Sequence, residues 1–546
     1  MKPKTNSARS RPPGRDADGV QQSDDAAPSI VFVAALTAII ALVAGSVLYL
    51  PWTSRPFDVL DFSEFVPLLR ANGGIGSRWS ALVDYYATQG RFNPLGHLFI
   101  ALKWTVLGEH PVLWQGLRAL QMSVLAGLGA ALLHRLGASR SGSVIGALLL
   151  VVSGAATSGW LRLTAAEPVG AIFLFGAVLL ALDYQRATRW RERAVAISLL
   201  VLAALLVKEL LIVLVPLVAI TALCRVGMSW HRPSLAARDR WLLGAGTVSV
   251  LLAIVPVAIV AQRAAATSYA SQYGASRTLG GGLPFLIEAA LLPSTPAFGR
   301  PGASLVIPAN LLFLLVVACG GALLLRDARP ESRRDRLRTM FGLAALPVLC
   351  ALAYMPWPVW VNFYALPYTI APAALLAFAL TGAERSGNSA ARWFVTAGAL
   401  LGLAYASAGA FSTARLSLAT QEVKATVALM LPSLADRDSV LVPEARGHRQ
   451  EWQRLGPTLG RYGRAFGSGR VPLVRGVRCE EAMAAVAGGL GQSAVIAFHD
   501  ECGLPPRSEA SVRRTFRLLD PLTFEPYPDS VRADVVAPGW RGPGRR

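Results

Sequence analysis

The sequence is poor in charged residues, and the charge that it carries is mainly of one sign. Of 546 residues only 16% are charged and 53% are hydrophobic, with 53 lysines and arginines against 33 aspartates and glutamates. A soluble domain carries about 25% charged residues and lacks repeated apolar runs of about 20 residues. A soluble globular protein is therefore excluded, and we expect a polytopic membrane protein.

The formal net charge of +20 raises the alternative of a nucleic-acid-binding protein. The arginines, however, are spread over short loops between apolar runs. Positive residues in such loops are the usual topology signal of a membrane protein, because they stay in the cytoplasm. The charge therefore predicts orientation in the membrane, and we expect no nucleic-acid partner.

Cysteine is also scarce, with five in the chain. Cys224, Cys319 and Cys350 lie in or beside apolar runs, where a small buried thiol is the ordinary role. Cys479 and Cys502 lie in the hydrophilic C-terminal region, where a pair fits an oxidising compartment. Their disulfide would close a loop of about two dozen residues and add about 3 kcal/mol of stability. The alternative is two free thiols in a cytoplasmic tail.

The sequence shows no internal repeat, P-loop, zinc-type spacing or dinucleotide fingerprint. Residues 1–29 are rich in Pro, Ser, Asp and Arg, and we expect them to form a disordered cytoplasmic tail. The apolar run 30–50 is too long for the core of a signal peptide and lacks a convincing cleavage site. It is therefore expected to remain as the first membrane span.

Residues 30–412 are expected to form a transmembrane domain with eleven crossings. The run 95–107, within the first external loop 51–110, is too short to cross and favours an interfacial or re-entrant helix. Lys208 and Glu209 interrupt a long apolar run, which predicts two short helices that meet at a charged hairpin. The spans are expected near 30–50, 111–133, 142–160, 169–184, the two halves of 194–224, 241–262, 304–325, 339–356, 365–382 and 393–412.

The distribution of arginine predicts the orientation. With a cytoplasmic N-terminus, most loop arginines lie on the cytoplasmic side, which is the expected bias. An odd number of crossings then places residues 413–546 outside, in agreement with the cysteine pair. We expect a multi-pass protein of the inner (plasma) membrane. The opposite short loops hold few cations, namely Arg162, Lys208, Arg263, Arg277 and Arg300.

Residues 413–546 are predicted to form a small extracytoplasmic α/β domain. Short apolar runs at 438–442, 471–474 and 493–498 are typical of buried strands, and helical stretches are expected near 414–434 and 480–490. The predicted fold class is thus an α-helical polytopic membrane protein with a small C-terminal α/β domain.

On this topology the ionisable residues at the edges of spans meet on the external face. Each alone is an ordinary interface residue, but four separate hairpins place acids and bases on the same side. Ionisable groups are energetically costly near a membrane, so these residues are candidates for a functional role. The candidates are Asp58 and Asp61 after the first span, then Arg91, Arg118, Arg162, Glu167, Lys208 and Glu209.

This combination of groups suits one kind of chemistry. A carboxylate at an interface can take a proton from an acceptor hydroxyl. Cations beside it can hold a phosphate and stabilise the charge on a departing phosphate group. A cavity among membrane helices admits a lipid carrier. Together they indicate sugar transfer from a polyprenyl-phosphate donor to an acceptor outside the cytoplasm.

Four motifs, taken in order, resemble those of the GT-C glycosyltransferases, which include protein O-mannosyltransferases and the lipid A aminoarabinose transferase. The resemblance covers about residues 30–412. LDFSEF, centred on Asp61, matches the acidic motif of the first external loop, and WLRLTAAEP matches the second external turn. The others are LLVKELLIVLVP, with its Lys-Glu pair, and NFYALPYTIAP, which contains Tyr364.

The resemblance implies a membrane glycosyltransferase with a polyprenyl-phosphate-linked sugar as donor. Its acceptor would be a cell-envelope glycan, lipid or protein. Asp61 or Asp58 would act as general base, with inversion at the anomeric carbon. The donor phosphate would be held by Lys208, Arg162 and Arg91, with Glu167, Glu209, Arg118 and Tyr364 in supporting roles.

The sequence departs from the family in its first loop. Members often carry two adjacent acids there, whereas here Leu60 precedes Asp61 and Asp58 lies further back, so the identity of the base is left open. The Trp-Trp-Asp motif of oligosaccharyltransferases is absent, so transfer of an oligosaccharide to asparagine is not expected. The sequence identifies no cofactor. A divalent cation is left open, since the carboxylates can ligate one. His97 and His110 receive no metal role.

Three other functions compete. A surface-polysaccharide polymerase or ligase would have a larger late polar loop with arginines, whereas the stretch 355–365 is short and has none. A flippase or transporter of lipid-linked sugar would favour charges at mid-membrane and two related halves. A non-catalytic membrane protein that binds an envelope partner is the third.

Overall fold

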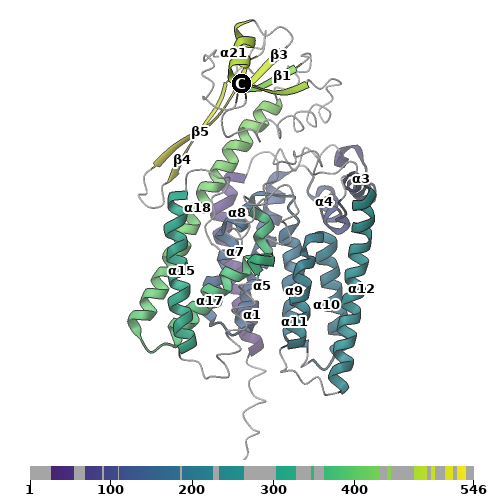
Figure 1. Cartoon of the computed structure of the whole chain (residues 1–546), viewed down its shortest axis with the longest axis vertical. Coiled ribbons are helices and arrows are strands. Elements are labelled where there is room, and N and C mark those ends of the chain that lie inside the picture. Colours follow the sequence, from purple (N-terminus) through teal and green to yellow (C-terminus); the bar gives the residue numbers. More distant parts are fainter. Residues whose placement is uncertain are drawn as a thin grey trace, which may run out of the picture.

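A computed structural model describes most of the helical part of the chain and the strands of its C-terminal part. In this part a bundle of apolar helices carries a β-sheet at one end (Figure 1). The described residues are 26–53, 65, 68–88, 91–108, 110–184, 187–224, 233–263, 303–326, 346–349, 362–429, 439–443, 473–488, 493–497, 511–519 and 526–536.

Five of the described helices contain a stretch long and apolar enough to cross a membrane, so the chain is a multi-pass membrane protein. Other apolar helices pack with them: α9 (Glu167–Leu182), α10 (Trp190–Val207), α11 (Val215–Cys224) and α15 (Ala303–Arg326). The total of eleven crossings stays a prediction, because most of 339–356 lies outside the described residues. The five helices that contain a membrane-spanning stretch are α1 (Ala26–Thr53), α5 (Pro111–Arg135), α12 (Pro233–Arg263), α17 (Ile370–Arg385) and α18 (Ser389–Leu429).

Helix α17 is the most enclosed of these, with 94% of its apolar stretch buried. Small residues let its neighbours approach closely, as is common between membrane helices. A Cβ on Gly142 of α6 (Arg140–Ala147) would lie 2.6 Å from the Ala377 carbonyl oxygen, and a Cβ on Gly146 would collide with the Ala373 carbonyl. Glycine at these two positions therefore sets the contact between α6 and α17.

The stretch 142–160 is not the single straight span that the sequence predicted. It forms α6, α7 (Leu149–Val152) and α8 (Gly154–Leu161), and the chain bends by 53° between them. The break lies at Ser153, whose backbone is extended and whose Oγ accepts a hydrogen bond from the Ala156 amide at 3.2 Å. A serine that caps a helix in this way starts a new helix rather than continuing the old one.

The charged hairpin predicted within 194–224 is confirmed. Helix α10 ends at Val207, and Lys208 is extended with φ −153° and ψ 106°. A short 3₁₀ helix, η2 (Glu209–Leu214), follows and leads into α11. Helix α9 packs against both arms of the hairpin. The break therefore presents Lys208 and Glu209 at one end of the bundle.

The segment 51–110, predicted as the first external loop, shares a second hydrophobic core with Trp114 of α5 and with Leu163. It contains α4 (Pro94–Leu107), close to the predicted run, and α3 (Ile75–Ala87), which was not predicted from the sequence. Both lie at the end of the bundle that carries the sheet (Figure 1). Helix α4 is about 21 Å long, too short to cross a bilayer. The core comprises Phe65, Leu69, Leu82, Tyr86, Ile100, Ala101, Trp104, Trp114 and Leu163.

The C-terminal strands form a mixed five-stranded sheet in the order β2-β1-β3-β5-β4. The predicted strands near 438–442, 471–474 and 493–498 correspond to β1 (Ser439–Pro443), β2 (Leu473–Val477) and β3 (Ser493–Ala497), which pair in parallel. The strands β4 (Ser511–Leu519) and β5 (Pro526–Val536) pair antiparallel and were not predicted. That these strands and α21 (Cys479–Ala487) form a domain on the outer face stays a prediction.

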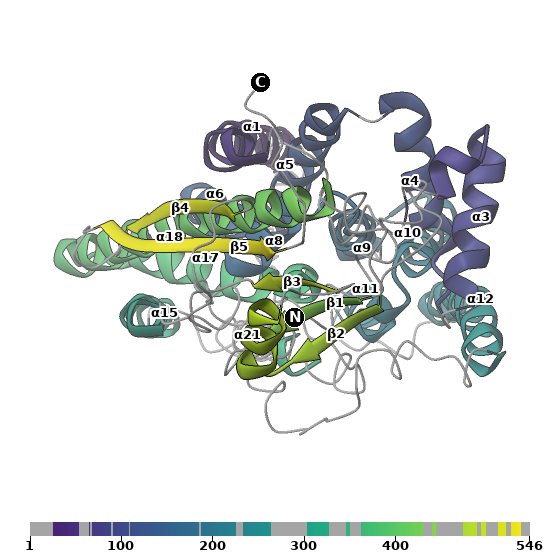
Figure 2. The same ribbon diagram turned by 90° about the horizontal axis from the view of Figure 1, so that it is seen from above.

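Helix α18 joins the bundle to the sheet. Its 41 residues run without a break through the expected last span and most of the separate helix predicted at 414–434. Strands β4 and β5 contact this helix and run along it when seen from above, while α3 and α12 lie at the other side of the bundle (Figure 2). Cys479 is disulfide-bonded. Its pairing with Cys502, which lies outside the described residues, stays a prediction.

The contact between α6 and α17 yields a test. Gly146→Leu should lower the thermal midpoint of the detergent-solubilised protein strongly, because overpacking a tight contact costs about 1–3 kcal/mol or more. Gly244→Leu is the matched control on α12, where a Cβ meets nothing within 4 Å. Equal midpoints for the two variants would contradict the tight packing of α6 on α17.

Candidate functional site

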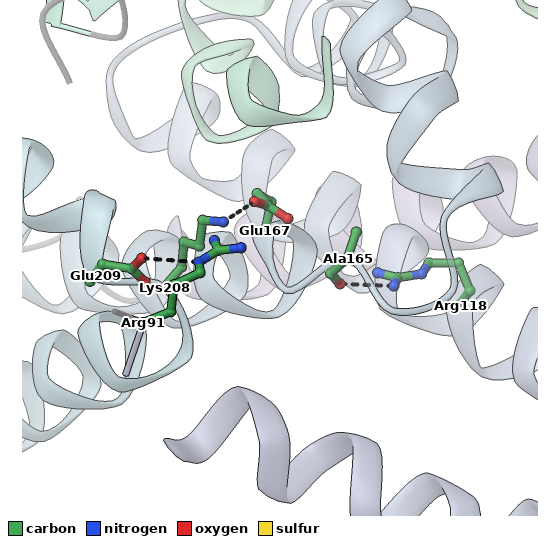
Figure 3. Close-up of polar contacts among 6 residues, drawn as sticks. All are labelled: Arg91, Arg118, Ala165, Glu167, Lys208 and Glu209. Carbon is green, nitrogen blue, oxygen red and sulfur yellow. Dashed lines mark hydrogen bonds and ion pairs between the residues drawn. The ribbon is translucent and has the colours of Figure 1, made fainter. Parts of the chain in front are cut away.

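Four charged side chains meet at the sheet-bearing end of the bundle (Figure 3). The Lys208 ammonium lies 3.0 Å from Glu167 Oε1, and the two side chains are 6% and 1% exposed. Arg91 Nε lies 3.9 Å from Glu209 Oε1, with exposures of 12% and 13%. We refer to these four residues as the charged cluster. It draws on the first external loop, the start of α9 and the α10–η2 hairpin.

The local sequence explains how each member is presented. Glu167 is the first residue of α9 and Pro168 follows it, in a first turn where a negative side chain is favoured by the helix dipole. Lys208 lies at the break between α10 and η2. Arg91 follows α3, and its amide donates to the Tyr86 carbonyl at 3.0 Å.

The arrangement of the cluster is electrostatically balanced. The Arg91 guanidinium and the Lys208 ammonium lie between the carboxylates of Glu209 and Glu167 (Figure 3). Burying an ion pair costs several kcal/mol per ion in lost hydration, and Coulomb attraction returns this only with good geometry. Such pairs add little stability over an apolar replacement, so the cluster is a candidate functional site.

Arg118, for which a supporting role was predicted, contacts the backbone beside the cluster. It is 1% exposed, and its Nη2 donates to the carbonyls of Arg162 at 2.8 Å, Leu163 at 2.8 Å and Ala165 at 2.9 Å. These carbonyls belong to the turn that leads into α9. Arg118 therefore fixes the turn that presents Glu167, and it acts on the cluster through the backbone.

The structure brings together four of the predicted site residues, Lys208, Glu167, Arg91 and Glu209. Arg162 lies on the turn held by Arg118, and Glu167 contacts Lys208. Tyr364 belongs to η3 (Asn362–Tyr368), which packs on α8 and α9, but its side chain is outside what the structure describes. Asp58 and Asp61 also lie outside the described residues.

His97 lies beside the cluster, although no site role was predicted for it. Its side chain is 5% exposed and stacks on Tyr86 with ring centroids 4.6 Å apart. Burial lowers the pKa of His97 to about 3, and the charges of Arg91 and Lys208 act in the same direction. The imidazole is therefore neutral at physiological pH. The signal in the sequence is Asn93-Pro94, which starts a helix one turn before this histidine.

Within the described ranges, no group of three or more His, Cys, Asp or Glu side chains could hold a metal ion. Asp58 and Asp61, the carboxylates that could ligate a divalent cation, lie outside these ranges. The residues of the charged cluster form two acid–base pairs, and a guanidinium and an ammonium are not metal ligands.

No model of a known protein family and no curated protein matches the chain. Among solved structures, ArnT from Cupriavidus metallidurans bound to undecaprenyl phosphate is 14% identical, with a TM-score of 0.46 over 93% of this chain and 99% of that one. The oligosaccharyltransferase of Archaeoglobus fulgidus, in complex with Zn and sulfate, is 11% identical, with a TM-score of 0.43 over 90% and 72%. The arabinofuranosyltransferase AftD from Mycobacteria is 18% identical, with a TM-score of 0.42 over 92% and 40%.

These proteins are GT-C glycosyltransferases, the class that the motifs resemble. With TM-scores below 0.5, the likeness concerns the general layout of the fold and carries no argument about the site. The role of the site must therefore be inferred from the residues of this chain alone.

The buried pair can be tested by a double-mutant cycle. Lys208→Met and Glu167→Met should each destabilise the protein by about 3–5 kcal/mol, because each leaves an unpaired charge in a buried place. The double variant should regain most of this loss, which thermal unfolding would show. The exposed pair Arg189–Glu192 provides the control, and Glu192→Met should leave the midpoint unchanged. Additive losses in the double variant would contradict a direct Lys208–Glu167 interaction.

Proposed function

We propose that the protein is a membrane glycosyltransferase that moves a sugar from a polyprenyl-phosphate donor to an extracytoplasmic acceptor. The observation that carries the proposal is the charged cluster, in which Arg91 and Lys208 lie together, buried, at the end of an apolar bundle. A lipid-linked phosphate has the matching properties, since its tail is apolar and its headgroup is anionic.

The two cations suit a phosphate that is first bound and then released. An ammonium carries three N–H donors and a guanidinium five, and both groups can bind the oxygens of a phosphate. Glu167 and Glu209 hold both cations in place before the donor arrives, so little reorganisation is needed when the phosphate binds. In a site from which water is excluded, such preorganised charges stabilise the negative charge that grows on the leaving group.

For the general base we propose Asp61, with Asp58 as the alternative. Phe65, four positions after Asp61, is buried and stacks on Tyr86 with ring centroids 5.5 Å apart. Tyr86 in turn stacks on His97 beside the cluster. Four residues of chain reach at most about 14 Å, and this short link to the buried Phe65 supports a role for Asp61 at this end of the bundle.

In the proposed step, the carboxylate of Asp61 takes the proton of an acceptor hydroxyl, and the acceptor oxygen forms a bond to the anomeric carbon. The bond from that carbon to the phosphate oxygen breaks on the opposite face, which inverts the anomeric centre. The electron pair leaves with the polyprenyl phosphate, whose charge Lys208 and Arg91 balance. The sugar and the acceptor, a glycan, lipid or protein of the cell envelope, are not assigned.

Loss of Lys208 should weaken the donor site. Lys208→Ala should reduce binding of polyprenyl phosphate by about 10–100-fold, the value of a charge-assisted hydrogen bond, and affect acceptor binding less. Titration of purified protein with each substrate measures both. The Lys208→Met/Glu167→Met variant serves as a folded control that should still fail to bind. Lys103→Ala replaces a lysine of α4 that lies 5.6 Å from the Trp114 ring centroid, and it should bind normally. Equal losses for donor and acceptor would argue against a phosphate role.

Replacement of the base should stop the reaction without affecting insertion. Asp61→Asn keeps the size of the side chain and removes its ability to accept a proton, so transfer should fall by at least about 100-fold. Asp58→Asn, assayed in parallel, decides between the two acids. Wild-type turnover from both variants would remove the proposed base, while normal thermal midpoints exclude misfolding as the cause of a loss.

A further inference from the structure

Beside the charged cluster lies a second set of polar atoms, and these are uncharged. Asn93 is 8% exposed and His97 is 5% exposed. Within the described part of the chain, Asn93 Oδ1 and His97 Nδ1 are buried and have no hydrogen-bond partner. A buried polar atom without a partner costs about 1–3 kcal/mol, so a protein rarely keeps two of them close together without a use.

The two residues lie together at the start of α4. They are four residues apart, and the His97 amide donates to the Asn93 carbonyl at 3.0 Å. Asn93 is the N-cap of α4, yet its side chain makes no capping hydrogen bond. Asparagine at this position usually caps the helix. Its oxygen is thus left available for another partner.

The start of α4 is held against the charged cluster. A Cβ on Gly96 would lie 3.0 Å from the Val207 carbonyl oxygen, so α4 approaches the end of α10 closely, next to Lys208. The Trp79 indole donates to the Pro94 carbonyl at 2.8 Å and fixes the start of α4 from the other side. The charges of Arg91 and Lys208 both act on the His97 ring.

We propose that Asn93 and His97 form a subsite for the hydroxyl groups of the donor sugar, and that this sugar is a neutral one. The inference rests on the proposed function and deepens it. An amide oxygen accepts a hydrogen bond from a sugar hydroxyl, and a neutral imidazole nitrogen either donates or accepts one. A cationic amino group would gain no carboxylate partner from Asn93 or His97, and the nearby Glu167 and Glu209 are already paired with Lys208 and Arg91.

The test compares lipids with and without a sugar. The probes are polyprenyl phosphate, the same lipid linked to mannose or arabinose, and the same lipid linked to 4-aminoarabinose. Wild-type protein should bind at least one neutral-sugar lipid about tenfold more tightly than the bare lipid, and more tightly than the amino-sugar lipid. If wild-type protein binds every probe equally or prefers the amino-sugar lipid, the proposed subsite is wrong, and no variant is needed to show this.

The decisive variant is His97→Phe, which keeps the stacking on Tyr86 and removes both ring nitrogens. Because Nδ1 has no partner among the described residues, the thermal midpoint should stay the same or rise. The preference for the neutral-sugar lipid should fall about tenfold, while binding of the bare lipid is unchanged. Asn93→Ser is a milder change that keeps an N-cap residue, and it should also lower the preference for the neutral-sugar lipid. It tests the subsite even if His97→Phe misfolds.

The matched control is His110→Phe, which replaces an exposed histidine at the start of α5 in the same region. It should leave the preference unchanged. If His97→Phe and Asn93→Ser also leave it unchanged, the subsite is wrong, although the phosphate site survives. If wild-type protein binds no polyprenyl phosphate at all, the proposed function itself fails, and the subsite fails with it.

Discussion

The contact between Lys208 and Glu167 is the interaction on which the candidate site depends. Both side chains are buried, and each offsets part of the cost of removing the other's charge from water. The pair also joins the start of α9 to the α10–η2 hairpin. One interaction therefore fixes both the charge of the site and the relation between two of the elements that form it.

The surroundings of this contact are arranged to keep it rigid. Arg118 holds the turn before α9 through three backbone carbonyls, and Gly96 lets α4 lie against the end of α10. The hydrophobic core that the first external loop shares with Trp114 and Leu163 then covers the same end of the bundle. Because these groups are already ordered, substrate binding does not have to offset the entropy cost of ordering them, which is the advantage of a preorganised site.

Much of this arrangement could be predicted from the sequence. Lys208 and Glu209 inside a long apolar run indicated the hairpin, because charge is too costly there to be incidental. The break at Ser153 was not predicted, because a hydropathy pattern contains no information about a helix-capping hydrogen bond. The helix at 75–87 was not predicted either, because its many polar residues make the sequence similar to that of a loop. His97 was missed for another reason. A buried neutral ring on an apolar helix has no periodic signal, and its relation to Lys208 exists only in three dimensions.

Helix α18 has a mechanical consequence for the protein. At 1.5 Å per residue its 41 residues measure about 60 Å, twice the thickness of the hydrocarbon layer. An unbroken helix of this length behaves as a strut, because a hinge within it would require broken backbone hydrogen bonds. Because β4 and β5 also contact α18, a tilt of this strut would carry the two strands with it.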